Sequence, residues 1–350
     1  MENYICLFDN GLEISFYSQV KVDSIISELV FNTSMTGYQE IFTDPSYAQQ
    51  TVVMTYPLIG NYNLNSLVSQ SQAAKISCLI AKEAEDCVVN YLNSHNIPVI
   101  TGLDTRDLTQ KIRDGKVKKL GIWKASEFSR EKSSELIKEF EINTQDCILA
   151  SCVAKDVIIP GENSAKSNIL LIDCGVKQGI IDNLAKFGNI FIVPYSANIL
   201  ECIQKYSINR IIISNGPGNP ADLADLIAQI KDLIGEIPIY GICLGHQIIC
   251  LALGCRVEKM VFGHRGSNHP VIDTETNRVF LISQNHSYSV VTESIPNGVK
   301  AKYVNLNDET VEGIISEKFL IKTAQFHPES CPGTDDANFI FHEWFGESNE

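Results

Sequence analysis

The sequence has no apolar run long enough to cross a membrane, and its cysteines include no Cys-x-x-Cys pair. A membrane-spanning helix needs about 20 consecutive apolar residues, so a helical membrane protein is excluded. The eleven cysteines are scattered and odd in number, which is typical of reduced thiols rather than of a disulfide framework. Residues 1–5 lack the basic and apolar regions of a signal peptide, so we expect a cytoplasmic protein.

Positive charge is also scarce. Lysine and arginine number 28 against 42 aspartates and glutamates, which gives a formal net charge of -14. A nucleic-acid-binding surface needs clustered positive charge, so this balance argues against such a function. The chain shows no internal repeat and no low-complexity tract, and its 350 residues are enough for two domains.

The second half of the chain alternates short apolar runs with amphipathic stretches. Such runs, alternating with helices, predict a parallel sheet that is covered on both faces. We therefore predict an α/β fold over residues 168–350, with a doubly wound, mostly parallel sheet and helices on both faces. The expected strands are 169–173, 190–194, 210–214 and 237–241, and the expected helices are 176–187, 199–206, 222–233 and 247–253.

The first part of the chain, residues 1–150, has a different pattern, and its topology is not readable from the sequence. We predict a smaller mixed β/α domain here, and read the polar, turn-rich stretch within 151–167 as a linker. The expected strands are 4–8, 12–17 and 51–55, and the expected helices are 69–79, 83–93 and 105–114.

Cys243 occupies the most informative position in the chain. It lies in Gly241-Ile242-Cys243-Leu244-Gly245, between an apolar strand candidate and a helix candidate. This is the layout of a nucleophile elbow, in which two glycines allow a sharp turn. The thiol would stand at a helix N-terminus, whose partial positive charge favours a thiolate. The pattern predicts covalent catalysis on a carbonyl group.

A cysteine nucleophile requires a base and a group that orients the base. His327 in His327-Pro328-Glu329 is the best candidate base, because residues two apart in an extended segment share a side. Glu329 would then hold the imidazole. His246, three residues after Cys243, is expected to pack behind the turn instead.

An oxyanion requires fixed N–H donors, and Leu244 offers one by its position after the nucleophile. The loop 214–220 offers another, since Gly216 and Gly218 allow a close approach of the backbone; a plain turn is the alternative. Three polar segments, 36–47, 263–270 and 283–288, are interpreted as ordered loops. No compact spacing of metal ligands occurs, so no metal site is expected.

Together these motifs resemble the class I glutamine amidotransferases, with Gly241–Gln247 as the elbow and His327-Pro328-Glu329 as the other two triad members. Further segments are similar to the family of carbamoyl phosphate synthetase small subunits, in collinear order over nearly the whole chain. These segments are 30–48, 55–61, 102–109, 263–271 and 326–329.

The resemblance implies that residues 1–150 dock onto a separate large subunit and that residues 168–350 hydrolyse glutamine. Ammonia would pass through a tunnel to the large subunit, which would use ATP, a divalent metal and bicarbonate to make carbamoyl phosphate for arginine and pyrimidine synthesis. The small subunit itself would need no cofactor, and its partners would be L-glutamine and the large subunit, in a heterodimer or a larger assembly. By match to the family, glutamine would be held between the two domains by Ser46, Gly216, Gly218, Leu244, Gln247, Asn285, Ser287 and Tyr288.

The sequence departs from the family at Ser287-Tyr288, where Gly-Phe is usual, and over residues 65–85. A serine can replace that glycine only if the position does not require a positive φ. Two alternatives remain open. One is another thiol enzyme on this scaffold, such as the amidotransferase chain of anthranilate synthase or a thiol peptidase. The other is a catalytically idle subunit that only docks to a partner.

Overall fold

The computed structural model describes residues 1–162 and 167–346 of the chain. The chain divides into two compact units, Met1–Asn143 and Thr144–Glu350, where the sequence suggested the ranges 1–150, 151–167 and 168–350. Helix α5 (Thr144–Leu149) belongs to the second unit, because Ile148 lies in the core of that unit. Within the expected linker, Val157–Ile159 forms strand β10, and residues 163–166 lie outside the described residues.

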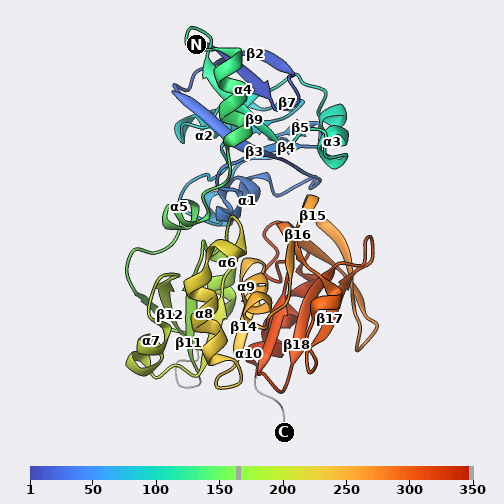
Figure 1. Ribbon diagram of the computed structural model, residues 1–350. Coiled ribbons are helices and arrows are strands. Elements are labelled where there is room, and N and C mark those ends of the chain that lie inside the picture. The colour runs from blue at the N-terminus through green and yellow to red at the C-terminus, as the bar shows by residue number, and fades with distance from the viewer. Residues whose placement is uncertain (163–166, 347–350) are drawn as a thin grey trace. The chain divides into compact units, whose positions relative to one another are not determined.

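The first unit contains a seven-stranded sheet with the order β2-β1-β9-β3-β4-β6-β8 and a separate pair, β5-β7 (Figure 1). The sheet is mixed, since β3, β4, β6 and β8 run parallel while β1, β2 and β9 pair antiparallel. The strands are β1 (Glu2–Phe8), β2 (Glu13–Ser18), β3 (Ser24–Asn32), β4 (Gln50–Met54), β5 (Leu58–Ile59), β6 (Cys78–Ile80), β7 (Glu83–Ala84), β8 (Val99–Ile100) and β9 (Lys119–Lys124). The helices are α1 (Tyr38–Thr43), α2 (Asp86–Ser94), α3 (Thr105–Arg113) and α4 (Arg130–Glu139), with 3₁₀ turns at Pro45–Tyr47 and Ser66–Val68.

Local sequence explains why some helices of the first unit were predictable and one was not. Asp104 caps α3, because its carboxylate accepts a hydrogen bond from the N–H of Asp107 at 3.0 Å. The prediction of a helix over 69–79 is wrong: this segment is irregular and ends in β6. Its buried apolar residues Ile76 and Cys78 lie two apart, so the segment follows the period of a strand and not that of a helix.

The second unit is built on a ten-stranded sheet with the order β10-β12-β11-β13-β14-β19-β18-β16-β15-β17. The five strands from β12 to β19 run parallel, which confirms the expected α/β class. The strands are β11 (Asn168–Asp173), β12 (Asn189–Pro194), β13 (Arg210–Ile213), β14 (Ile239–Ile242), β15 (Val257–Asp273), β16 (Val279–Val290), β17 (Lys300–Asn305), β18 (Val311–Ser316) and β19 (Ile321–Ala324). The helices are α6 (Gln178–Leu184), α7 (Ile199–Tyr206), α8 (Ala224–Leu233), α9 (Leu244–Ala252) and α10 (Phe339–Phe345).

Helices cover both faces of the parallel strands (Figure 1). Along β11, Leu170 and Ile172 pack in one core with α7, α8 and α9, while Ile169 and Leu171 pack in another with α6 and α10. Residues two apart along a strand face the same side, so a wholly apolar strand supplies two cores at once. This arrangement leaves the carboxyl ends of the parallel strands as the edge where a site can form.

The antiparallel half of this sheet was not anticipated. Segments 263–270 and 283–288, interpreted as polar loops, lie on the long strands β15 and β16, and that interpretation is wrong. The third such segment, 36–47, contains α1 and a 3₁₀ turn. Buried polar side chains line β15 and β16, so the apolar alternation that marks a strand is absent from their sequence.

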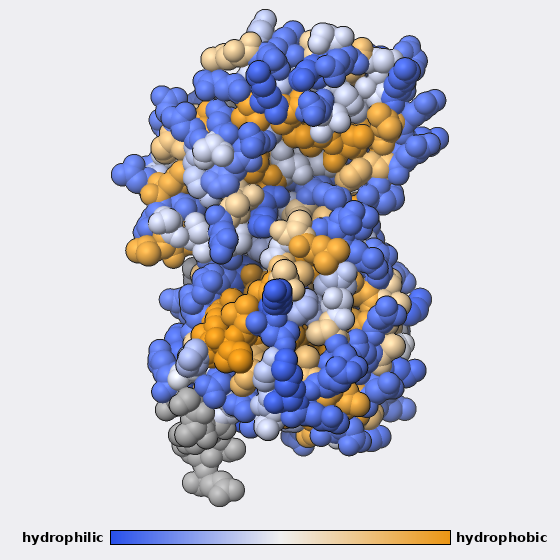
Figure 2. Space-filling view, turned by 90° about the vertical axis from the view of Figure 1, so that its left-hand side faces the viewer, coloured by the Kyte–Doolittle hydropathy of each residue, from blue (hydrophilic) through white to orange (hydrophobic). Residues whose placement is uncertain are grey.

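Figure 2 shows hydrophobic side chains gathered on part of the surface of the second unit. Exposed apolar residues of this unit include Val157 and Ile158 on the edge strand β10 and Leu200 on α7. With only three residues, β10 offers a short edge, which limits pairing with another chain. Among the described residues, no helix is long and apolar enough to span a membrane.

Candidate active site

The turn from β14 into α9 has the geometry of a nucleophile elbow. Cys243 stands between them with φ 53° and ψ -102°, a positive φ that is rare for a residue with a side chain. A Cβ on Gly241 would lie 2.6 Å from the backbone of Gly245, and one on Gly245 would lie 2.2 Å from the carbonyl oxygen of Ile213. Glycine is therefore required at both positions for the helix to begin this close to the strand.

The elbow places the Cys243 thiol at the carboxyl edge of the parallel strands and at the start of α9. The residue is only 2% exposed, and its Sγ lies 3.5 Å from the carbonyl oxygen of Asn285, to which the thiol donates. Leu244 is the first residue of α9, so its N–H has no acceptor within the helix. This N–H is the first expected donor to an oxyanion.

His327 follows β19, the strand that pairs with β14. The N–H of Cys243 donates to the carbonyl oxygen of Ala324 at 2.8 Å, which fixes the ends of the two strands side by side. Nδ1 of His327 lies 2.7 Å from Oε1 of Glu329, and Nε2 of His327 makes no hydrogen bond. The cysteine, the histidine and the glutamate thus lie at one edge of one sheet, and the imidazole keeps one nitrogen for a reacting group.

Lys177 completes this arrangement and was missed in the sequence. It follows β11, is 1% exposed, and places Nζ 2.9 Å from Oε1 of Glu329 and 2.7 Å from the carbonyl oxygen of Ser330. Burial alone would raise the pKa of Glu329, but the charges of Lys177 and His327 and their hydrogen bonds outweigh it and lower the pKa to about 2. Glu329 is therefore ionised throughout the neutral range, and its charge is shared between the lysine and the imidazole.

We expect this lowered pKa to appear as a pH dependence of stability. A carboxylate whose pKa is lower in the folded state stabilises that state above its unfolded pKa, and the stabilisation is lost as the pH falls through the folded value. The gap in unfolding free energy between the wild type and Glu329→Gln should therefore narrow, by up to about 3 kcal/mol, from about pH 5 towards pH 2. Urea unfolding at a series of pH values measures this gap, and Glu317→Gln, at an exposed turn, should show no such narrowing. An unchanged gap for Glu329→Gln would contradict the assigned charge state.

The glycine loop after β13 packs directly against the elbow. The N–H of Gly245 donates to the carbonyl oxygen of Ser214 at 3.1 Å. A Cβ on Gly216 would lie 2.8 Å from Cδ2 of Leu244, and one on Gly218, where φ is +91°, would lie 2.3 Å from Oγ1 of Thr144. Gly216 thus lies against the side chain of Leu244, at the start of the elbow helix.

Strand β16 brings the other residues expected to bind glutamine to the same edge. Nε2 of Gln247 donates to the carbonyl oxygen of Tyr288 at 3.0 Å, and the Asn285 carbonyl meets the Cys243 thiol. Ser287 does not take a positive φ, so the departure from glycine at this position introduces no backbone strain. Its hydroxyl contacts the buried guanidinium of Arg265, which lies in the polar segment 263–270 and had been given no role of its own.

Two other residues were named from the sequence, His246 and Ser46. His246 is fully buried behind the elbow, with Nδ1 2.7 Å from Oγ1 of Thr323, and burial lowers its pKa to about 3. The packing of His246 behind the turn agrees with the sequence prediction. Ser46 belongs to the first unit, where its N–H donates to the carboxylate of Asp44 at 2.9 Å. Its role in binding glutamine stays a prediction.

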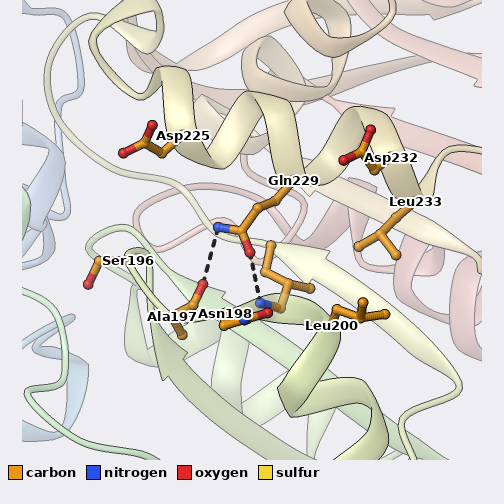
Figure 3. A pocket seen from close by; sticks show the side chains of 9 residues that line it. Ser196, Ala197, Asn198, Leu200, Asp225, Gln229, Asp232 and Leu233 are labelled. Carbon is orange, nitrogen blue, oxygen red and sulfur yellow. Dashed lines mark hydrogen bonds between the residues drawn. The ribbon is translucent and has the colours of Figure 1, made fainter.

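A separate cleft of about 520 Å³ lies between α7 and α8 (Figure 3). Gln229 crosses it, accepting a hydrogen bond from the N–H of Ile199 at 2.9 Å and donating to the carbonyl oxygen of Ala197 at 3.3 Å. Asp225 and Asp232 also line this cleft, and none of the residues expected in the active site does so. The cleft therefore offers no alternative location for the cysteine chemistry.

Two family models match the chain. Residues 170–346 match the model described as glutamine amidotransferase class-I. Residues 7–122 match the model described as carbamoyl-phosphate synthase small chain, CPSase domain. The two matches fall on the second and first units respectively.

Curated relatives match the chain over most of their length. A carbamoyl phosphate synthase small chain from Methanocaldococcus jannaschii is 43% identical, covering 91% of each chain. One from Methanococcus maripaludis is 41% identical, covering 91% of this chain and 90% of its own. One from Caldanaerobacter subterraneus is 42% identical, covering 91% and 88%. Among solved structures, a glutamine amidotransferase from Thermotoga maritima is 16% identical and covers 47% of this chain and 76% of its own, with a TM-score of 0.36.

Proposed function

The chain belongs to the family of carbamoyl phosphate synthase small chains, and from that premise we propose that it hydrolyses L-glutamine through a cysteine thioester. It is the glutaminase subunit of a glutamine-hydrolysing carbamoyl-phosphate synthase. One observation carries the mechanism: Cys243 stands on a strained elbow beside the strand that leads to the His327–Glu329 pair, at the same edge of the sheet. A nucleophile, a base and an orienting carboxylate at one edge are what acyl transfer requires.

The first half of the reaction removes ammonia. The Cys243 thiol gives its proton to Nε2 of His327, and the resulting thiolate attacks the side-chain carbonyl carbon of glutamine, forming a C–S bond and an oxyanion. The N–H groups of Leu244 and Gly216 hold that oxyanion, and one such donor is typically worth about 3 kcal/mol. His327 gives its proton to the leaving nitrogen, so the C–N bond breaks and ammonia departs from a thioester.

The second half releases glutamate. His327, now neutral, takes a proton from a water molecule that attacks the thioester carbon. The C–S bond then breaks, which returns the thiolate and leaves glutamate. Glu329 orients His327 throughout and stabilises its charged form, and Lys177 holds Glu329. No cofactor is required in this chain for either half.

The ammonia is proposed to pass to a large subunit, which uses ATP, a divalent metal and bicarbonate to form carbamoyl phosphate. The first unit, matched by the small-chain model, is proposed to dock that subunit in a heterodimer. The product would serve arginine and pyrimidine synthesis. A cytoplasmic location is supported by the cysteines, all of which are free thiols among the described residues.

The alternatives are less well supported. An amidotransferase chain of another synthase would have no reason to carry the first unit, which the small-chain model matches over residues 7–122. A catalytically idle docking subunit would not need a buried ion pair between Lys177 and Glu329 beside an unpaired imidazole nitrogen. The hydrolytic function accounts for both features.

Covalent labelling tests this function directly. A glutamine analogue carrying a diazo-ketone or chloro-ketone should alkylate one thiol, and peptide mass spectrometry should place the label on Cys243. An excess of glutamine should protect that thiol, while labelling of the exposed Cys87 by a simple haloacetamide should be unaffected by glutamine. Labelling spread over several cysteines without protection would refute the proposal. Purification from the source cell should also recover a large ATP-using chain.

A further inference from the structure

A buried polar cluster lies in the antiparallel half of the second unit, next to the residues of β16 that are expected to bind glutamine. His264 on β15 pairs in register with His286 on β16, and Glu312 on β18 completes the group. One ligand-type atom from each residue, an imidazole nitrogen or a carboxylate oxygen, lies within 4.8 Å of the other two. The three residues are 4%, 5% and 0% exposed, so water reaches them poorly.

Two polar atoms in this cluster are left without partners. Nδ1 of His264 makes no hydrogen bond, and neither does Oε2 of Glu312. The nearest approach between the two residues is 3.4 Å, from Nδ1 to Oε1. An unsatisfied buried polar group destabilises the fold, and a charged one does so more strongly. Two of them side by side indicate a site that a cation would complete.

His264 and Glu312 are already held at their outer atoms. Nε2 of His264 lies 2.8 Å from the carboxylate of Asp308, and Oε1 of Glu312 accepts from Asn305 at 3.2 Å. With Nε2 protonated, Nδ1 of His264 turns its lone pair towards the cluster. Imidazoles that ligate a metal are oriented in this way, by a carboxylate or a carbonyl on the second nitrogen.

His286 is oriented in the same manner by its own strand. Its Nδ1 lies 2.8 Å from the carbonyl oxygen of Tyr288, so with Nδ1 protonated its Nε2 also turns a lone pair towards the cluster. Nε2 lies 3.2 Å from the side-chain amide oxygen of Gln284. In this tautomer both atoms are acceptors, so no hydrogen bond joins them. An ion bound to Nε2 would replace this contact.

We propose that His264, His286 and Glu312 bind a divalent transition-metal ion of the zinc class. Two imidazoles and a carboxylate suit such an ion, whereas Mg²⁺ and Ca²⁺ prefer oxygen ligands alone. Ligand atoms about 2.1 Å from a tetrahedral ion lie about 3.4 Å apart, which is the separation of His264 Nδ1 and Glu312 Oε1. The ion joins β15, β16 and β18, so its role is structural, and the inference does not depend on glutamine hydrolysis.

The sequence could not reveal this site. A metal motif is recognised when its ligands are close together in the chain, whereas these three come from three different strands. Only the register between β15 and β16, broken by two bulges, brings His264 opposite His286. The absence of a compact ligand spacing therefore said nothing about this cluster.

A proton competes with the ion. Burial opposes a charge on His264, but the nearby carboxylates of Asp308 and Glu312 outweigh it and raise the pKa of His264 to about 9. His269, His286 and Arg265 also face this histidine or its neighbours and disfavour further positive charge there. Because an imidazole must be deprotonated to bind a metal ion, binding is tested at pH 8 to 9.

Titration of the full chain with Co²⁺ tests the proposal, after chelator treatment and with thiols kept reduced. One equivalent should bind and give visible d–d absorption without the intense near-ultraviolet band of a cobalt–thiolate bond, and Zn²⁺ should displace it. Glu312→Gln should lose this equivalent, whereas Glu317→Gln, on an exposed turn near the end of β18, should keep it. Asp308→Asn should weaken binding about 10- to 100-fold, because Asp308 only orients His264.

The opposite results are equally clear. If the wild type binds no equivalent of Co²⁺ at pH 8 to 9, the proposal is overturned. The cluster would then hold a proton on His264 instead of a metal ion. A spectrum dominated by the thiolate band would overturn it too, since the ion would then be on cysteine. Should Glu312→Gln fail to fold, the wild-type spectrum and Asp308→Asn, whose carboxylate is partly exposed, still decide the matter.

Discussion

Replacing Cys243 with serine should lower the rate of glutamine hydrolysis by more than about 10⁴-fold, because removal of a nucleophile from a unit of cooperating residues costs nearly the whole of their effect. The side chain is 2% exposed and its neighbours are fixed by the elbow glycines, so a hydroxyl can replace the thiol without moving the backbone. A serine hydroxyl at this position is a far weaker nucleophile at neutral pH than a thiolate. Steady-state release of glutamate measures the loss.

The same variant separates hydrolysis from synthesis. In a complex with the large subunit, Cys243→Ser should still support formation of carbamoyl phosphate from added ammonia, since the thioester is bypassed. Cys87→Ser, at an exposed thiol of the first unit, should leave both activities unchanged. Undiminished glutaminase turnover in Cys243→Ser would remove the basis of the proposed mechanism.

The elbow was predictable because every residue that defines it is local. Gly241, Cys243 and Gly245 lie within five positions, and their spacing alone dictates a sharp turn between a strand and a helix. The alternation of apolar runs with helices likewise gave the parallel strands that carry it. Both are short-range patterns, and local geometry follows from them before any tertiary contact is known.

The antiparallel strands were not predictable for the opposite reason. Strands β15 and β16 bury His264, Arg265, Gln284 and His286, so the sequence shows polar residues where a strand normally shows apolar ones. The register of the sheet brings His264 opposite His286, and Arg265 reaches the hydroxyl of Ser287 on the neighbouring strand. Such pairing depends on contacts between distant segments, which no local pattern contains.

Lys177 shows the same limit within the active site. A lysine after a strand is ordinarily solvated, and nothing near it in the chain marks it as buried. Its partners, Glu329 and Ser330, lie in the last part of the sequence, and only the adjacency of strand ends brings them within 3 Å. A weak signal was present: Asp173 ends β11 at the same carboxyl edge, so the residues that follow it were bound to lie near the site.

Lys177→Met should therefore weaken both the fold and the reaction. Removing one partner of a buried ion pair leaves the other charge uncompensated, which typically costs about 3–5 kcal/mol of unfolding free energy. Glu329 would then be held by the imidazole alone, and its misplacement should lower kcat by about 10²-fold with a smaller change in KM. Urea unfolding and steady-state kinetics on the same preparation measure the two effects.

The pH profile distinguishes positioning from a purely structural role. With Lys177 gone, His327 alone opposes the effect of burial on Glu329, so the pKa of Glu329 rises from about 2 and the carboxylate is neutralised at a higher pH. The acidic limb of kcat/KM should accordingly move to higher pH in Lys177→Met. Lys186→Met removes an exposed lysine just after α6. This variant should leave the unfolding free energy, kcat and the pH of the acidic limb unchanged. Suppose that Lys177→Met is less stable but the acidic limb of its kcat/KM profile stays at the same pH. Lys177 would then support the fold without acting on the Glu329–His327 pair.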